Sequence, residues 1–246
     1  MRLPGDWCSE ASIWQLVESC GYSADLEAWH DLARNSRTGV LDLGCGIGRV
    51  AHDLARSGIP VTGIDLDAGI VADFNRLSPE PGTRALAGDA ADPELPGGHF
   101  DRIIAPQQLL QILGGRQHRE ALITATASRL TAGGVAAFAF SEELPAESVE
   151  PVLMPDLREV ETWIYSSRPV RLEAGPDSVT VHRLRQRVSP DGELVETRDR
   201  TTLARLTRDE LADELIAAGL GPSGWIEVPA TDLHVASVIA IAGPVG

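Results

Sequence analysis

Residues 40–49 of this chain read VLDLGCGIGR, and this stretch decides the fold. It begins with a short, mostly apolar strand, continues through glycines at positions 44, 46 and 48, and runs into a segment with helical periodicity. Glycine lets the backbone adopt left-handed conformations and approach a ligand closely. The amides at the start of the following helix would face the same ligand. The segment therefore predicts a strand, a ligand-binding loop and a helix.

The alternation of strand and helix continues along the chain. Apolar strands are expected at residues 40–43, 61–64, 84–87, 100–105, 135–140, 225–228 and 235–241. Helices are expected at residues 12–21, 24–33, 48–57, 69–77 and 119–130. Strands that alternate with helices form parallel sheets with crossover connections. We therefore predict an α/β fold with a doubly wound, mostly parallel seven-stranded sheet.

A different pattern follows residue 141. Residues 142–156 are rich in proline and acidic side chains and predict a connector, and residues 163–165, 179–188 and 193–203 predict strands. Asp191-Gly192 between two of them predicts a β-hairpin. Thr207 and Glu210 then form a capping box for a helix that ends at Gly219. The chain divides into N-terminal helices that cap the site (1–36), a core domain (37–141 and 207–246) and an antiparallel β insertion (142–206).

Composition limits the partners and the compartment. The chain has 246 residues and a net charge of −15, so its surface repels phosphate backbones and no nucleic acid is expected to bind. No segment has the length of a membrane span or the apolar core of a signal peptide. Cys8, Cys20 and Cys45 lack metal-ligand spacing and cannot all pair. We expect a cytoplasmic protein with reduced thiols, no membrane partner and no metal.

Three interpretations of the glycine loop compete. A turn without a ligand is possible, although each glycine costs conformational entropy. A dinucleotide site would have the spacing G-x-G-x-x-G. In this chain the third glycine follows the second after one residue, and position 49 is Arg. The spacing disfavours NAD and favours a loop for S-adenosylmethionine.

The loop resembles motif I of the class I, Rossmann-like S-adenosylmethionine-dependent methyltransferases. Further segments resemble the family in its order: Ile64-Asp65, Gly88-Asp89-Ala90, residues 100–106 and residues 130–134. The resemblance covers residues 22–141 well. It implies that the chain binds S-adenosylmethionine, transfers its methyl group and releases S-adenosylhomocysteine.

The resemblance also implies which residues hold the donor. Asp65 would bind both ribose hydroxyls, Leu66 would pack on the adenine, Asp89 would accept from the adenine amino group, and the Ala90 amide would reach the ring. Asp42 lies near the C-terminal end of its strand, where it can accept from amides or from an ammonium group. The remaining expected contacts are Tyr22 at the methionine end, Gly44, Cys45 and Gly46 in the loop, and Pro106 near the reacting centre.

The acceptor is expected to be a small molecule. After the fourth strand the chain reads PQQLLQ, without the Asn-Pro-Pro-aromatic signature of methyltransferases that act on nucleic acids or protein amides. The amides of Gln107, Gln108 and Gln111 could orient such an acceptor. The insertion resembles the β lid of several natural-product and amine methyltransferases. It supplies Trp163 as a substrate contact and His182 and Tyr165 as candidate bases.

Other interpretations stay open at this point. Arg183, Arg185 and Arg187 share one strand face and are interpreted as a solvated basic surface. The methylated atom could be O, N or C. A donor-binding enzyme of another type, such as a cyclase, and a non-catalytic donor-binding module are the alternatives. Formation of S-adenosylhomocysteine would distinguish them. The protein could be a monomer or a homodimer, and a role in secondary metabolism would suit the lid.

Overall fold

The computed structural model describes residues 8–19, 21–78, 80–92, 98–231 and 234–245, so the predicted thiol at Cys20 lies outside the described residues. One sheet is built from β1 (Val40–Leu43), β2 (Val61–Asp65), β3 (Arg84–Ala87), β4 (Phe100–Ala105), β5 (Leu130–Phe140), β10 (Leu220–Val228) and β11 (Ser237–Pro244). Its order is β10-β11-β5-β4-β1-β2-β3, and only β11 runs antiparallel to its neighbours. This confirms the predicted α/β fold with a mostly parallel seven-stranded sheet.

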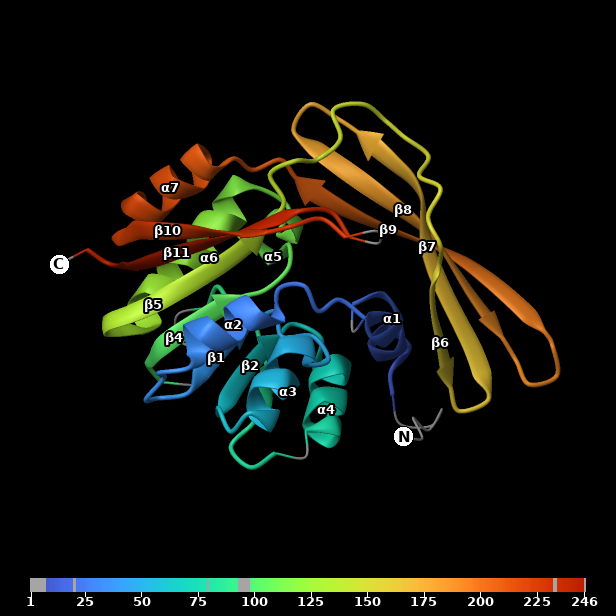
Figure 1. Cartoon of the computed structure of the whole chain (residues 1–246), viewed down its shortest axis with the longest axis horizontal. Coiled ribbons are helices and arrows are strands. Elements are labelled where there is room, and N and C mark those ends of the chain that lie inside the picture. The colour runs from blue at the N-terminus through green and yellow to red at the C-terminus, as the bar shows by residue number, and fades with distance from the viewer. Residues whose placement is uncertain (1–7, 20, 79, 93–97, 232–233, 246) are drawn as a thin grey trace.

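Helices cover both faces of this sheet (Figure 1). They are α1 (Glu10–Glu18), α2 (Leu26–Ala33), α3 (Arg49–Arg56), α4 (Ala68–Leu77), α5 (Leu109–Ile112), α6 (Arg116–Arg129) and α7 (Arg208–Ala217). Successive residues of a strand point to opposite faces. Leu41 therefore packs into a cluster with residues of α5, α6 and α7, while Val40 packs into a second cluster with residues of α2, α3 and α4. No described helix has the length and apolarity needed to cross a membrane.

A second sheet of four antiparallel strands follows β5. It contains β6 (Asp156–Val160), β7 (Trp163–Ala174), β8 (Ser178–Val188) and β9 (Leu194–Ala204) in that order. We call it the lid sheet. Figure 1 shows it beside α1, beyond the end of the main sheet. The lid insertion after the fifth strand is confirmed, whereas the boundaries at residues 36, 141 and 206 stay a prediction about domains.

Several local predictions are confirmed or corrected. The β8–β9 hairpin forms, with Gly192 at a φ of 84° in its turn. The Thr207 side chain accepts from the Glu210 amide, and Glu210 bonds back, as the capping box predicts. β7 extends beyond the predicted residue 165 because a register shift between Pro169 and Arg171 accommodates the proline. The edge strand β6 and the single-turn helix α5 were not predicted, because neither has a clear apolar periodicity.

Candidate functional site

The glycine loop between β1 and α3 has the backbone conformation that its sequence predicts. Gly44, Gly46 and Gly48 have φ angles of 62°, 53° and 90°, all in the left-handed region that glycine adopts without strain. A Cβ atom on Gly44 would lie 2.8 Å from Cδ1 of Leu109, and one on Gly46 would lie 2.5 Å from Oε1 of Gln15. The backbone angles therefore favour glycine at these two positions, and any larger residue would also have to displace the ends of the Leu109 and Gln15 side chains.

Asp65 connects the glycine loop to the end of β2. Its Oδ2 accepts a hydrogen bond from the Gly46 amide at 2.9 Å, and its Oδ1 accepts one from the Asp67 amide at 3.0 Å. A carboxylate has about four lone-pair sites, so these two bonds leave capacity on both oxygens. Asp65 also lines a cavity, so that capacity is available to a ligand.

Asp42 is a buried carboxyl group with an incomplete set of partners. Its side chain is fully enclosed, and Oδ1 has no hydrogen-bond partner among the described residues. Burial raises the pKa of Asp42 to about 8, although the positive charge of Arg49 acts in the opposite direction. A buried polar atom without a partner usually has a specific explanation, such as a bound group. An ammonium group beside β1 would supply the missing donor and favour the ionised form.

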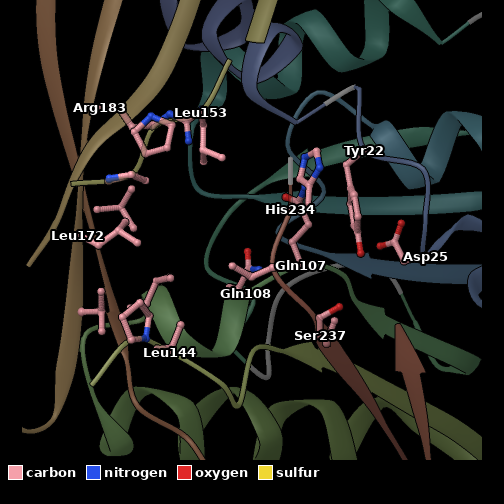
Figure 2. Close-up of a pocket in the computed structure, with 18 residues that line it drawn as sticks. Tyr22, Asp25, Gln107, Gln108, Leu144, Leu153, Leu172, Arg183, His234 and Ser237 are labelled. Carbon is pink, nitrogen blue, oxygen red and sulfur yellow. The ribbon is translucent and has the colours of Figure 1, made fainter. Parts of the chain in front are cut away.

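Two adjoining cavities lie between the glycine loop and the lid sheet. The donor-side cavity, of about 460 Å³, is bounded by the glycine loop, Asp65, Pro106, α1 and the inner face of the lid. The chamber, of about 240 Å³, lies between the lid and the end of β11 (Figure 2). The two share Gln107, Gln108, Val181, Arg183, Leu203 and His234. A ligand in one cavity would therefore meet a ligand in the other at this shared wall. Among the described residues, no His, Cys, Asp and Glu side chains are grouped to hold a metal ion.

Most of the predicted donor contacts line these cavities. Tyr22 lines the chamber, Gly44, Asp65 and Pro106 line the donor-side cavity, and a third pocket of about 80 Å³ contains Cys45 and Gly46. The predicted adenine contacts line none of them. Leu66 is 72% exposed, and Asp89 is exposed and caps its own turn by accepting from the Ala91 amide at 2.8 Å. Ala90 is half-buried. The roles of these three residues stay predictions.

Gln111 is not available to a substrate, which corrects its predicted role. Its side chain is fully buried and donates to the carbonyl oxygens of Ser141, at 3.0 Å, and Ala204, at 2.9 Å. Its Oε1 accepts from the Ser141 amide at 2.8 Å. Gln111 therefore ties the end of β5 to the end of β9. Gln107 and Gln108 keep their predicted place because both line the shared wall.

The lid residues predicted to act on the substrate also need correction. His182 points to the outer face of β8 and pairs with Glu173 at 3.0 Å, whereas the adjacent Val181 and Arg183 face the cavities. Tyr165 is buried edge-to-face against Trp14, with ring centroids 5.4 Å apart, and burial raises its pKa. A ring enclosed in this way cannot reach an acceptor, so neither His182 nor Tyr165 fits the role of base.

Trp163 packs on the lid and lines neither the donor-side cavity nor the chamber. It packs on the cluster formed by α1 and the lid, and the guanidinium of Arg187 lies 6.0 Å from the centre of its ring. The arginines beside it are not a solvated surface either. Arg185 donates to Glu18 and lies 3.2 Å from Asp199, and its side chain is only 20% exposed. The sequence interpretation failed here because the acidic partners come from α1 and from the adjacent strand β9.

Helix α1 supplies two residues that the sequence did not indicate. Oε1 of Gln15 accepts from the Ile47 amide at 2.9 Å and covers the glycine loop. One turn later, Glu18 accepts from Ser167 at 2.7 Å and from Arg185 at 2.7 and 2.8 Å. Burial alone would raise the pKa of Glu18, but the hydrogen bonds from Arg185 and Ser167 outweigh it and lower the pKa. No local pattern could reveal contacts between residues 149 and 167 positions apart.

His234 is a further residue that the sequence analysis missed. Its ring lines both cavities and lies on the Tyr22 ring, with centroids 4.6 Å apart. Arg49 lies 5.0 Å from the centre of the Tyr22 ring and also forms two bonds of 2.7 Å with Asp25. Burial lowers the pKa of His234, so the neutral ring is the main form at neutral pH. A lone histidine before the last strand carries no motif, so only the fold reveals its position.

Comparisons with known proteins agree with this architecture. Residues 40–134 match the family model described as a methyltransferase domain. The magnesium-protoporphyrin O-methyltransferase of Rhodobacter capsulatus is 31% identical over 130 residues, which are 47% of this chain and 56% of that protein. The chain thus spans little more than half the length of this curated relative.

Solved structures share the fold over nearly the whole chain. The amino pentose methyltransferase CalS10 from Micromonospora echinaspora has a TM-score of 0.71 and 21% identity, and covers 94% of this chain and 97% of its own. The sugar N-methyltransferase KedS8 from a Streptoalloteichus species has a TM-score of 0.70 and 17% identity, with coverages of 98% and 96%. The CcbJ methyltransferase from Streptomyces caelestis has a TM-score of 0.66 and 18% identity over 100% of both chains.

Proposed function

We propose that this chain, a member of the class I S-adenosylmethionine-dependent methyltransferases through its domain at residues 40–134, methylates a small-molecule acceptor. The observation that carries the proposal is the glycine loop, whose residues are left-handed and whose Gly46 amide donates to the Asp65 carboxylate. The strand before the loop adds the buried Asp42, whose Oδ1 has no partner among the described residues. A dinucleotide loop would not require this spacing.

The residues present fit the methyl donor. The unused lone pairs of Asp65 suit two ribose hydroxyls. Asp42 lines none of the three cavities, so the ammonium of the methionine end would have to displace the groups that enclose its Oδ1 to bind it. Leu66, Asp89 and Ala90 would hold the adenine at the open edge of β2 and β3. When bound, S-adenosylmethionine supplies a methyl group on a positively charged sulfur, which is already electrophilic. The protein then has to align the acceptor with that methyl group and exclude water.

The shared wall of the two cavities is where the acceptor would react. We place the candidate base at His234 in place of His182 and Tyr165, because its ring faces both cavities and burial lowers its pKa. CalS10, described as an enzyme of calicheamicin biosynthesis, supports a role in natural-product biosynthesis by analogy of fold. We further propose a cytoplasmic monomer or homodimer that needs no metal.

Calorimetric titration tests the donor assignment. S-adenosylmethionine and S-adenosylhomocysteine should bind one to one, and NAD should bind about 100-fold more weakly or not at all, because the glycine spacing does not suit a pyrophosphate. Binding of NAD without binding of either adenosyl compound would overturn the proposal. A cyclase or a non-catalytic module would bind the donor, but neither would form S-adenosylhomocysteine with an acceptor.

A further inference from the structure

The walls of the chamber indicate the class of acceptor. We propose that the chamber binds an uncharged molecule with an apolar body and a single nucleophilic hydroxyl or amine, which points towards His234. This inference rests on the proposed function, because it describes the second substrate of the same site. It goes further by excluding acceptors that carry phosphate, carboxylate or several hydroxyl groups.

Apolar side chains form the lid side of the chamber. They come from the connector, from β7, β8 and β9, and comprise Leu144, Leu153, Leu172, Val179, Val181 and Leu203. Figure 2 shows Leu144, Leu153 and Leu172 on one side of the cavity, with Tyr22, His234 and Ser237 on the other. A volume of about 240 Å³ is below the roughly 300–1,000 Å³ of drug-sized pockets, so one or two rings would fill it.

The two ionised residues that line the chamber are already paired. Arg183 donates to Asp156 at 2.6 Å and to Ser167 at 3.0 Å, and lies 3.4 Å from Glu18. Asp25 accepts from both terminal nitrogens of Arg49 and from the Trp29 indole. A buried charge is costly unless it is paired. A charged acceptor would therefore lose its hydration and would have to break an existing ion pair to replace it.

Most polar groups of the chamber lie on the side opposite the leucines, and part of that side is the wall shared with the donor-side cavity (Figure 2). Gln107 and Gln108 line this wall beside His234, and Gln107 has a φ of 58°, which is unusual for a residue other than glycine. The Tyr22 hydroxyl is hydrogen-bonded to Ser237. The chamber thus offers hydrogen bonds mainly at this one end.

Burial leaves the ring of His234 neutral, because it lowers the pKa more than any neighbouring charge changes it. Asp156 and Asp25 raise its pKa, Arg49 and Arg183 lower it, and burial is the largest contribution and lowers it. A neutral ring can accept one hydrogen bond from an acceptor and then its proton. A hydroxylated sugar would satisfy this end, but its other hydroxyl groups would face leucine and valine without partners. Burying a hydroxyl group without a hydrogen-bond partner costs free energy, so each such group would weaken the binding of the sugar.

The experiment uses two small probes and a pair of adjacent substitutions. The probes are 1-naphthol, which is uncharged and apolar with one hydroxyl, and thymidine diphosphate, which is polar and anionic. Leu153→Trp replaces a smaller aliphatic side chain of the chamber wall with an indole ring. Val152, the preceding residue, is 99% exposed and does not line the chamber. Val152→Trp is therefore the matched control. Each protein is first titrated with S-adenosylhomocysteine by calorimetry and then, when saturated, with each probe.

We expect 1-naphthol to bind wild type and Val152→Trp equally, and Leu153→Trp about tenfold or more weakly, with unchanged S-adenosylhomocysteine affinity in all three. Thymidine diphosphate should not bind. Stronger binding of thymidine diphosphate than of 1-naphthol, no binding of 1-naphthol, or equal 1-naphthol affinity in both variants would each overturn the inference. Absence of S-adenosylhomocysteine binding to wild type would instead overturn the proposed function. If Leu153→Trp does not fold, Leu172→Trp replaces it, because Leu172 lines the chamber and not the donor-side cavity.

Discussion

The main sheet and the lid sheet are stabilised by different interactions. The main sheet is buried on both faces, and its central strands β1 and β4 contain mostly enclosed residues. The lid sheet has one open face, and most residues of β9 are partly or fully exposed. Its inner face contacts α1 through an apolar cluster and through the ion pairs of Glu18 with Arg183 and Arg185.

This difference separates the two halves of the proposed reaction. In the proposed reaction, the loops of the main sheet would hold the donor, whose position must be fixed for methyl transfer. Residues of the lid line much of the proposed acceptor chamber. The lid is positioned against α1 by directional ion pairs as well as by apolar packing. Substitutions in the two sheets should therefore change different measurements.

The largest effect is expected for Asp65→Ala in the main sheet. The substitution removes a carboxylate proposed to accept two ribose hydrogen bonds, each worth about 1.5–3 kcal/mol and not additive, so affinity should fall on the order of 100-fold. It also frees the Gly46 amide, which loosens the loop. Calorimetric titration with S-adenosylhomocysteine measures the loss.

Asp65→Asn is the matched control because its amide oxygen can still accept from Gly46. Its affinity should lie between those of wild type and Asp65→Ala. Binding by Asp65→Ala at wild-type strength would show that Asp65 is not part of the donor site. The proposal that the main sheet binds the donor would then lose its main support.

The second prediction concerns the pH dependence of stability and a histidine in a helix that packs on the main sheet. His52 of α3 packs on Phe74, with ring centroids 4.4 Å apart, and burial, followed by the charge of Arg56, lowers its pKa to about 4. Above the unfolded value of about 6.5, both states are neutral and stability is unaffected. As pH falls from about 6.5 to 4, the unfolded state takes up a proton that the folded state does not, so stability falls.

His52→Gln should remove this part of the slope, about 2–3 kcal/mol between pH 6.5 and 4. Urea unfolding followed by circular dichroism at a series of pH values measures it. The same substitution at exposed His118 controls for the loss of a histidine as such. An unchanged slope in His52→Gln would show that the helix layer opens enough to admit water at His52.

The main sheet was largely predictable because its signals are local. Residues 40–49 specify a strand, a loop and a helix within ten positions, and Asp65 follows directly at the end of the next strand. The capping box at Thr207 and the turn at Gly192 are local as well. In each case the residues that define the structure are close together in the sequence.

The acceptor side was predicted poorly because it depends on contacts between distant segments. Alternation along β8 correctly separates His182 from Arg183, but it cannot tell which face meets α1. In the sequence, Gln111 has the appearance of a ligand-binding amide. Only the fold shows that its side chain is bonded to the ends of β5 and β9. His234 acquires its position only when the last strand lies beside Tyr22.

The last prediction has the smallest effect and tests whether the two halves are independent. Helix α1 contacts both, since Gln15 covers the glycine loop and Glu18 pairs with the lid. Glu18→Gln keeps the shape of the side chain but leaves Arg183 and Arg185 with weaker partners in a site where both are only about 20% exposed. Stability should fall by about 1 kcal/mol, between the values for exposed and buried ion pairs.

The informative measurement is the dissociation rate of S-adenosylhomocysteine by stopped-flow fluorescence. If a shift of the lid also shifts α1, loss of the Glu18 charge weakens the hydrogen bond between Gln15 and the Ile47 amide. Dissociation of S-adenosylhomocysteine should then accelerate about twofold to fivefold, which corresponds to a fraction of the free energy of one hydrogen bond. Exposed Glu159 of β6 is the control, and Glu159→Gln should change neither quantity. A destabilised Glu18→Gln with wild-type dissociation would show that the lid and the donor loop are coupled in folding but not in binding. In that case α1 supports the two sites separately, and the donor would enter and leave without movement of the lid.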